Sequence, residues 1–301
     1  MIKEKWDASN IADQSGRVVI VTGSSSGIGF EAAKVLAGKN ANIIIAVRNL
    51  GKGNLAADRI KLQYKNAVVS VMEVDLANLK SIRTFADNFR KQYSHLDLLI
   101  NNAGVMIPPY SNTEDGFELQ FGTNHLGHFA LTALLIDFIR ETKNSRIINV
   151  SSAAHKSGDI NFDDLNWAKR KYSAWRAYGD SKIANLYFTY ELQRRLDIAG
   201  SKVIAAAAHP GWTATELQRH SGIFIALNGI FAQKVHMGAL PTLYAATANN
   251  VNGGDYFGPS GWQEWRGYPK KVASNALSHD KIIAAHLWEV SEALTNINFK
   301  L

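Results

Sequence analysis

Short apolar segments alternate along the chain with longer segments whose apolar residues recur every three or four positions. The segments 18–21 and 42–47 are rich in β-branched residues and apolar at nearly every position, which is typical of strands buried on both faces of a parallel sheet. We expect four more such strands, at 67–74, 96–100, 146–150 and 202–208. Because strands and helical segments alternate with short connections, the pattern predicts an α/β fold with a doubly wound parallel sheet.

Helical periodicity covers the segments that follow these strands, namely 30–36, a segment ending near 61, 79–93, 115–142 and 175–199. Two further segments interrupt the alternation. Residues 155–174 form a polar insertion, which we expect at the surface beside a substrate site, and residues 215–235 are apolar and loosely patterned. The apolar segment is either a lid over a substrate or an ordinary core helix, and the sequence favours neither.

Composition narrows the class of protein. The chain has 301 residues, of which 46% are hydrophobic, enough for one large core. It has no cysteine, which excludes disulfides, thiolate zinc sites and a cysteine nucleophile and favours an intracellular protein. The net charge of +7 is scattered, so we expect no nucleic-acid partner. The polar start and the lack of an apolar run of ~18 residues predict no signal peptide and no integral membrane segment. We therefore expect a cytoplasmic protein and leave peripheral membrane contact open.

A glycine-rich turn joins the first strand to the first helix. Thr22 is followed by Gly23-Ser24-Ser25-Ser26-Gly27-Ile28-Gly29, and a strand, glycine turn and helix in this order are typical of a nucleotide site. Glycines let a pyrophosphate approach backbone N–H groups, and the start of the helix presents unpaired donors to the anion. A serine–glycine turn without any ligand is the alternative. The predicted cofactor contacts here are Gly23, Ser25, Ser26, Gly27, Ile28 and Gly29.

The end of the second strand favours NADP(H) over NAD(H). In dinucleotide folds that bind NAD, an Asp or Glu at this place accepts a hydrogen bond from the ribose 2′-hydroxyl. This chain has no Asp or Glu between Glu31 and Asp58. Arg48 stands there instead, and a guanidinium suits a 2′-phosphate. The alternative is an ordinary surface arginine. Asp75, after the third strand, is placed to accept from an adenine amino group or simply to cap a loop.

Tyr178 and Lys182 lie one helical turn apart near the start of the helix at 175–199. A phenol has a pKa of about 10, too high for acid–base work near neutrality. A cation at ~4 Å contributes roughly 4 kcal/mol at an effective dielectric of about 20, so we expect Lys182 to lower the pKa of Tyr178 toward neutrality. The spacing alone is commonplace on helices. The position of the pair favours a catalytic role, because it follows the fifth strand, which ends at Ser151-Ser152 on the carboxyl edge of the sheet, where such sheets bind ligands.

Taken in order, these motifs resemble the short-chain dehydrogenase/reductase (SDR) family over nearly the whole chain. The matching positions are Thr22-Gly23-x-x-x-Gly27-x-Gly29, Asp75, Asn101-Asn102-Ala103-Gly104, Asn124, Ser152, Tyr178-x-x-x-Lys182 and Pro210-Gly211. Further segments resemble its retinol-dehydrogenase-like branch, namely 46–49, 124–129, 151–155, 209–211 and 256–259. The resemblance implies one Rossmann-type domain over 1–301. It also implies an enzyme that interconverts an apolar alcohol and its aldehyde or ketone with NADP(H).

The resemblance also implies roles for single residues. Tyr178 is the proton donor or acceptor, Lys182 assists it and holds the nicotinamide ribose, Ser152 binds the substrate oxygen, and Asn124 holds a water of a proton relay. The remaining implied cofactor contacts are Asp75, Leu76, Asn101, Asn102, Ala103, Gly104, Pro210, Gly211, Thr213 and Thr215. Two features depart from the pattern: Ser152 and Tyr178 are unusually far apart, and the cysteines of the similar light-driven protochlorophyllide reductases are absent.

Other readings stay open beside this one. The same fold without turnover is a sensor of NADP(H), although such a sensor has no need of Ser152, Tyr178 and Lys182 together. His125 and His128 have the spacing of metal ligands, but without a third ligand we expect histidines of the core or cleft, and no metal. The segment 258–269, with Trp262 and Trp265, is expected to pack over the substrate mouth. A homodimer through the helix that carries Tyr178 is common in the family and is undecided here.

Overall fold

The computed structural model describes residues 5–213 and 232–301. Thr215 and residues 215–231 of the expected apolar lid lie outside the described residues. The described part contains an eight-stranded sheet in the order β3-β2-β1-β4-β5-β6-β7-β8. All neighbouring strands are parallel except β7 and β8. The order reverses direction between β1 and β4, so the predicted doubly wound sheet is confirmed.

All six predicted strands agree with the structure to within two residues at each end, and the third, fourth and sixth begin two residues later than predicted. The strands are β1 Val18–Thr22, β2 Asn42–Val47, β3 Val69–Glu73, β4 Leu98–Asn101, β5 Arg146–Val150 and β6 Ile204–Ala208, followed by β7 Tyr256–Pro259 and β8 Pro269–Lys271. The last two strands were not predicted. They are short and contain glycine and proline, so they carry little of the pattern that marks the earlier strands.

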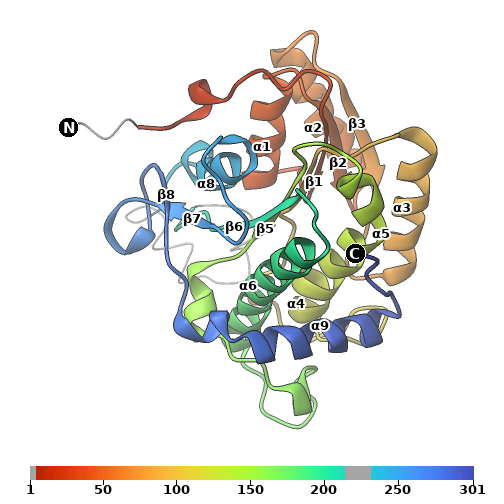
Figure 1. Cartoon of the computed structure of the whole chain (residues 1–301), viewed down its shortest axis with the longest axis vertical. Coiled ribbons are helices and arrows are strands. Elements are labelled where there is room, and N and C mark those ends of the chain that lie inside the picture. Colours follow the sequence, from red (N-terminus) through yellow and green to blue (C-terminus); the bar gives the residue numbers. More distant parts are fainter. Residues whose placement is uncertain (1–4, 214–231) are drawn as a thin grey trace.

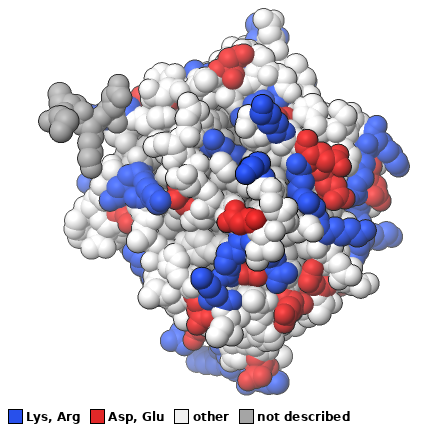
Figure 2. Space-filling view, viewed as in Figure 1, with Lys and Arg blue, Asp and Glu red and all other residues white. Residues whose placement is uncertain are grey.

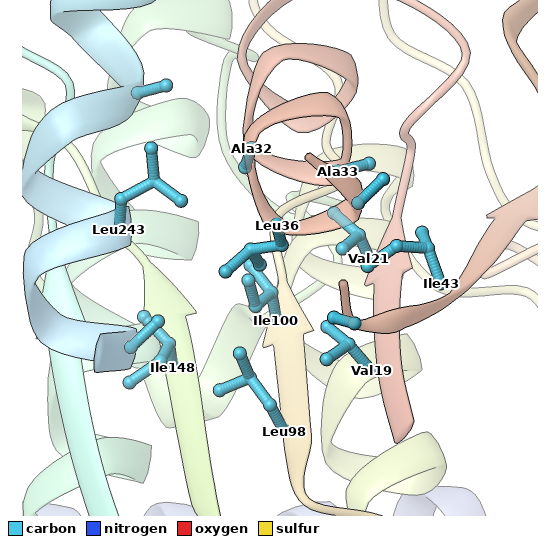
Figure 3. Close-up of a cluster of buried hydrophobic side chains, with 14 of the residues drawn as sticks. Val19, Val21, Ala32, Ala33, Leu36, Ile43, Leu98, Ile100, Ile148 and Leu243 are labelled. Carbon is cyan, nitrogen blue, oxygen red and sulfur yellow. The ribbon is translucent and has the colours of Figure 1, made fainter. Parts of the chain in front are cut away.

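Helices cover both faces of the sheet (Figure 1). They are α1 Gly27–Ala37, α2 Leu50–Gln63, α3 Leu79–Gln92, α4 Leu119–Phe121, α5 Gly127–Arg140, α6 Ala174–Ile198, α8 Val235–Thr247 and α9 Lys281–Thr295. Side chains of β1 alternate between the faces, as the pleat requires. Val19 and Val21 pack with α1, α2 and α8, whereas Val18 and Ile20 pack in the core that contains side chains of α3, α5 and α6. Figure 3 shows the first of these cores, where Leu36 and Leu243 meet the strands.

The helix expected at 115–142 begins later and is interrupted. It begins at Leu119, because Glu118 accepts the N–H of Phe121 at 2.7 Å and ends the preceding turn. Between α4 and α5 the chain forms one π-helical turn, Gly122–Leu126. Such turns insert one residue into the helical repeat and are frequent at functional sites. Asn124 lies in this turn.

Helix α9 packs against α6, the helix that carries Tyr178. Leu287 of α9 is buried in the same cluster as Ile183 and Tyr187 of α6, and Trp288 meets Phe188 at a ring-centroid distance of 5.9 Å. A dimer that used this face of α6 would have to displace α9. Among the helices formed by residues 5–213 and 232–301, none combines the length and the apolar character that a bilayer crossing requires.

We predict that Leu287→Ala lowers the free energy of unfolding by about 2–5 kcal/mol, because Leu287 is 1% exposed and its removal leaves a cavity beneath α9. The control is Ile282→Ala on the same helix, whose side chain is 83% exposed and whose loss costs at most about 0.5 kcal/mol. Urea unfolding followed by circular dichroism measures both. Equal effects of the two substitutions would show that α9 is not part of the cooperative fold.

Candidate active site

The glycine turn brings backbone N–H groups to the carboxyl end of the sheet. Gly23 and Gly27 have φ of 64° and 60°, a conformation that side chains other than glycine rarely adopt. A Cβ on Gly29 would lie 2.4 Å from Nδ2 of Asn102. Ser25, Ser26 and Ile28 lie half-buried on the same turn. Helix α1 begins at Gly27, so the N–H groups of its first turn have no carbonyl of the helix to bind and can hold an anion.

The loop after β4 lies between the glycine turn and the catalytic residues. Asn102 donates through Nδ2 to the carbonyl of Thr22 at 2.8 Å, and a Cβ on Gly23 would lie 2.8 Å from Cα of Ala103. A Cβ on Gly104 would lie 3.0 Å from Oδ1 of Asn124 and 3.7 Å from Nζ of Lys182. The predicted residues Asn102, Ala103 and Gly104 therefore lie against both groups. Asn101 instead points into the sheet and donates to Thr132 and Asn149.

The four predicted catalytic residues come together at the end of β5. Tyr178 and Lys182 are 5% and 3% exposed on α6, and Nζ of Lys182 lies 5.6 Å from the centroid of the Tyr178 ring and donates to the carbonyl of Val150 at 3.1 Å. Ser152 is the second residue after β5, and its hydroxyl lowers the pKa of Tyr178 by hydrogen bonding. Asn124 donates to the hydroxyl of Ser181, in the turn of α6 between Tyr178 and Lys182, at 2.9 Å.

The pKa expectation for Tyr178 is wrong for the protein chain alone. Burial raises the pKa of Tyr178 to about 12, and the hydrogen bond with Ser152 offsets only part of this. Burial lowers the pKa of Lys182 to about 8. Nζ of Lys182 donates to the Val150 carbonyl and lies over the tyrosine ring. Desolvation of the phenolate is the largest influence on the pKa of Tyr178, and it acts against the lowering that we expected.

Asn124 is bound to the backbone as well as to α6. Its Nδ2 donates to the carbonyl of Val105 at 2.9 Å, and its Oδ1 accepts the N–H of Val105 at 2.8 Å. These paired bonds hold the π-helical turn against the loop after β4. The expected role of Asn124 in holding a water stays a prediction.

Two residues predicted for the adenosine side follow β2 and β3. Arg48 is exposed directly after β2, at the same sheet edge as the glycine turn. Asp75 is half-buried, and its Oδ1 accepts the N–H of Ala77 at 2.9 Å, so it caps its own loop as the alternative reading expected. Leu76 is buried, and its carbonyl would lie 2.4 Å from a Cβ on Gly127 at the start of α5.

The segment 258–269 packs against the loop after β6. Gly211 has a φ of 63°, and a Cβ there would lie 2.4 Å from the carbonyl oxygen of Trp265. Thr213 donates to the carbonyl of Pro210 at 2.9 Å. The segment 258–269 therefore packs on the loop expected to hold the nicotinamide. Trp262, in contrast, is 71% exposed.

Asp180 is a buried acid beside the predicted catalytic residues that the motifs did not mark. It lies between Tyr178 and Lys182, is 8% exposed, and accepts the N–H of Asp159 at 2.9 Å. Arg170 approaches it at 3.6 Å. Asp180 therefore ties the insertion 155–174 to the catalytic helix. Because Asp164 and Trp167 of the insertion are also buried, the insertion is more than the polar surface element that was expected. A cavity of about 450 Å³ lies between it and Asp180.

The four histidines of this region are bound to protein groups. His125 contacts Ser291 of α9, and His128 contacts Thr22 and the carbonyl of Asn124. His155 lies at 2.7 Å from the carbonyl of Ser152, and His209 at 3.1 Å from Glu264. Within the described ranges, no group of three or more histidine, aspartate or glutamate side chains is placed to hold a metal ion.

Comparison with known proteins agrees with this arrangement. Residues 17–223 match the family model described as short chain dehydrogenase. The chain is 44% identical to human retinol dehydrogenase 13 over 94% of its length and 85% of that protein, and 42% identical to mouse retinol dehydrogenase 12 over 95% and 88%. A crystal structure of an uncharacterized protein from Mycobacterium paratuberculosis superimposes with a TM-score of 0.84, at 43% identity over 99% of this chain and all of that one.

The chain therefore belongs to the short-chain dehydrogenase family, and its fold is that of this class of oxidoreductases. Within the family it is similar to the retinol dehydrogenases over nearly its whole length, which confirms the resemblance drawn from the motifs. Members of this family act on alcohol and carbonyl groups with nicotinamide cofactors.

We predict that Asp180→Asn flattens the pH dependence of stability. Burial raises the pKa of Asp180 to about 7, well above its ordinary value of about 4, so folding favours the protonated form. Its contribution to stability is present below about pH 4 and is lost as the pH rises to about 7. Urea unfolding at pH 5 and pH 8 should show a smaller difference in the variant than in the parent.

The control for this experiment is Asp163→Asn, which removes the same charge at an exposed position of the insertion. It should leave the difference between pH 5 and pH 8 unchanged. If Asp180→Asn also leaves that difference unchanged, Asp180 titrates like an exposed aspartate, and its tie to the insertion does not depend on pH.

Proposed function

We propose that the protein is an NADP(H)-dependent oxidoreductase that interconverts an apolar alcohol and its aldehyde or ketone. One observation carries the proposal: Tyr178, Lys182, Ser152 and Asn124 are brought together at the end of β5, beside the loop Asn102–Gly104 that contacts the glycine turn. A nicotinamide cofactor fits these residues, because the turn with positive φ and the start of α1 suit a pyrophosphate. When bound, the cofactor supplies or accepts the hydride.

Tyr178 is the proton donor in the direction of reduction. With a pKa of about 12 its phenol stays protonated at neutral pH, the form that can donate to a substrate carbonyl oxygen. The hydroxyl of Ser152 faces the same phenol and is placed to stabilise charge that develops on that oxygen. Lys182, with a pKa of about 8, remains mostly cationic at neutral pH and favours the phenolate that is left behind.

The surroundings of Tyr178 support an apolar substrate. Its ring belongs to a buried cluster with Met106 and Ala154, against which Ile107 also packs. An apolar wall beside the proton donor favours an apolar group next to the reacting carbonyl. The similarity of the chain to retinol dehydrogenases supports the same class of substrate, since retinol is an apolar alcohol.

The first prediction of this proposal concerns Tyr178→Phe. Removing the hydroxyl should lower NADPH-dependent carbonyl reduction by about 10²–10⁴-fold, the usual share of a general acid, while the Kd for NADPH changes at most about twofold. The substrate panel runs from retinal through long-chain and aromatic aldehydes to ketones. Tyr190→Phe is the matched control, because Tyr190 lies on the same helix and binds Ser274 away from the site.

Two results would contradict the proposal. If Tyr178→Phe and Tyr190→Phe have equal activity, Tyr178 is not the acid. If the parent protein binds NADPH tightly and reduces no carbonyl of the panel, the chain is a sensor of the cofactor rather than an enzyme.

The second prediction concerns Arg48→Gln. A charge-assisted contact with the 2′-phosphate contributes about 1.5–3 kcal/mol, so the Kd for NADPH should rise about 10- to 100-fold while that for NADH changes little. Quenching of intrinsic fluorescence measures both constants. Lys61→Gln removes one positive charge at the far end of α2 and is the control. Equal effects of Arg48→Gln on the two cofactors would refute the assigned NADP(H) preference.

A further inference from the structure

The hydroxyl of Thr22 connects the glycine turn to the loop after β4. Its Oγ1 accepts the backbone N–H groups of Asn102 and Ala103, both at 2.9 Å. Thr22 is fully buried at the end of β1, so these bonds are shielded from water. With two N–H groups bound, the hydroxyl has used both of its lone pairs and can act only as a donor toward any third partner.

His128 of α5 is that third partner. It is 2% exposed, and its Nε2 lies 2.9 Å from Oγ1 of Thr22. Its Nδ1 lies 3.0 Å from the backbone carbonyl of Asn124, which can only accept, so Nδ1 carries the proton. Nε2 then offers a lone pair to the hydroxyl of Thr22. This lone pair is nearer than the Ile100 carbonyl, which lies 3.3 Å from the same hydroxyl.

With a neutral imidazole, every donor among these hydrogen bonds of Thr22 and His128 therefore has an acceptor. Burial and the nearby charge of Lys182 lower the pKa of His128 to about 4, against the opposing effect of its bond to the Asn124 carbonyl. The ring thus stays neutral at neutral pH and keeps the tautomer that both of its partners require. Protonation would place a second donor against the hydroxyl of Thr22, which has no lone pair left.

His125, one turn earlier, provides the contrast. It is equally buried, but its Nε2 contacts Ser291 of α9, and its ring packs among Phe121, Phe129 and Phe188. Within residues 5–213 and 232–301, its Nδ1 has no hydrogen-bond partner, and its Nε2 bonds to α9 rather than to the glycine turn or the loop after β4. His125 is an ordinary core histidine. The two hydrogen bonds of His128, in contrast, reach the hydroxyl of Thr22 before the glycine turn and the backbone carbonyl of Asn124.

We propose that His128 is a positioning residue that couples the cofactor-binding loop to the catalytic turn. Through Thr22 it orders the N–H groups of Asn102 and Ala103, and through the Asn124 carbonyl it fixes the π-helical turn Gly122–Leu126. The role in catalysis rests on the proposed function, but the coupling itself is a property of the fold. Loss of His128 should therefore loosen both the loop after β4 and the π-helical turn.

The test compares His128→Phe with His125→Phe. Hydrogen–deuterium exchange of the peptide that covers residues 100–106 should speed up at least tenfold in His128→Phe and remain near the parent rate in His125→Phe. This readout needs neither cofactor nor turnover, so it separates a failure of the coupling from a failure of the proposed function. Equal exchange in the two variants would overturn the proposal.

Cofactor affinity and a second variant complete the test. In His128→Phe the Kd for NADPH should rise about tenfold, and in a Thr22→Val background the same substitution should add less than about twofold, because the link is already cut. His128→Gln, whose amide oxygen can accept from Thr22, should recover part of the slow exchange. His128→Leu, which removes the same two hydrogen bonds with a smaller side chain, replaces His128→Phe if that variant does not fold. Additive effects of Thr22→Val and His128→Phe, or no recovery with glutamine, would show that His128 does not act through Thr22.

Discussion

The buried ammonium of Lys182 is the constraint on which the catalytic edge depends. A cation 3% exposed loses most of its hydration, and burial accordingly lowers its pKa to about 8. The carbonyl of Val150, the last residue of β5, accepts from it at 3.1 Å. This bond ties α6 to the end of β5. Gly104 of the loop after β4 lies against the same group, because a Cβ there would lie 3.0 Å from Oδ1 of Asn124 and 3.7 Å from Nζ of Lys182.

The same burial shapes the acid–base pair. It moves the pKa of Tyr178 up to about 12 and that of Lys182 down to about 8, so the phenol holds its proton at neutral pH while the ammonium of Lys182 loses its proton at a lower pH than an exposed lysine does. Around this pair the polar groups are bound to protein partners. Asn124 joins the π-helical turn to Val105 and Ser181, and Thr22 with His128 joins that turn to the glycine turn. The residues proposed to bind the cofactor and the substrate are thus held by one connected set of hydrogen bonds.

The sequence predicted the elements whose patterns are local. Strands β2 and β5 were placed without error because β2 is an almost wholly apolar run and β5 contains Ile147, Ile148 and Val150, all buried in the sheet. Strands β7 and β8 were missed because they are short and depend on pairing with β6 and with each other. The π-helical turn was missed because the bonds of Asn124 to Val105, distant in sequence, stabilise it. Helical spacing placed Tyr178 beside Lys182, but it could not show the depth of burial, which reverses the expected shift in the pKa of Tyr178.

The central claim is that this edge transfers a hydride from a nicotinamide to an apolar carbonyl. The most direct test supplies the purified protein with NADPH that carries deuterium at C4 of the nicotinamide, in the stereoisomer that is turned over, and an apolar aldehyde. Mass spectrometry should find one deuterium on the carbinol carbon of the alcohol product. Alcohol formed without deuterium from either stereoisomer, or no alcohol despite bound NADPH, would contradict the account.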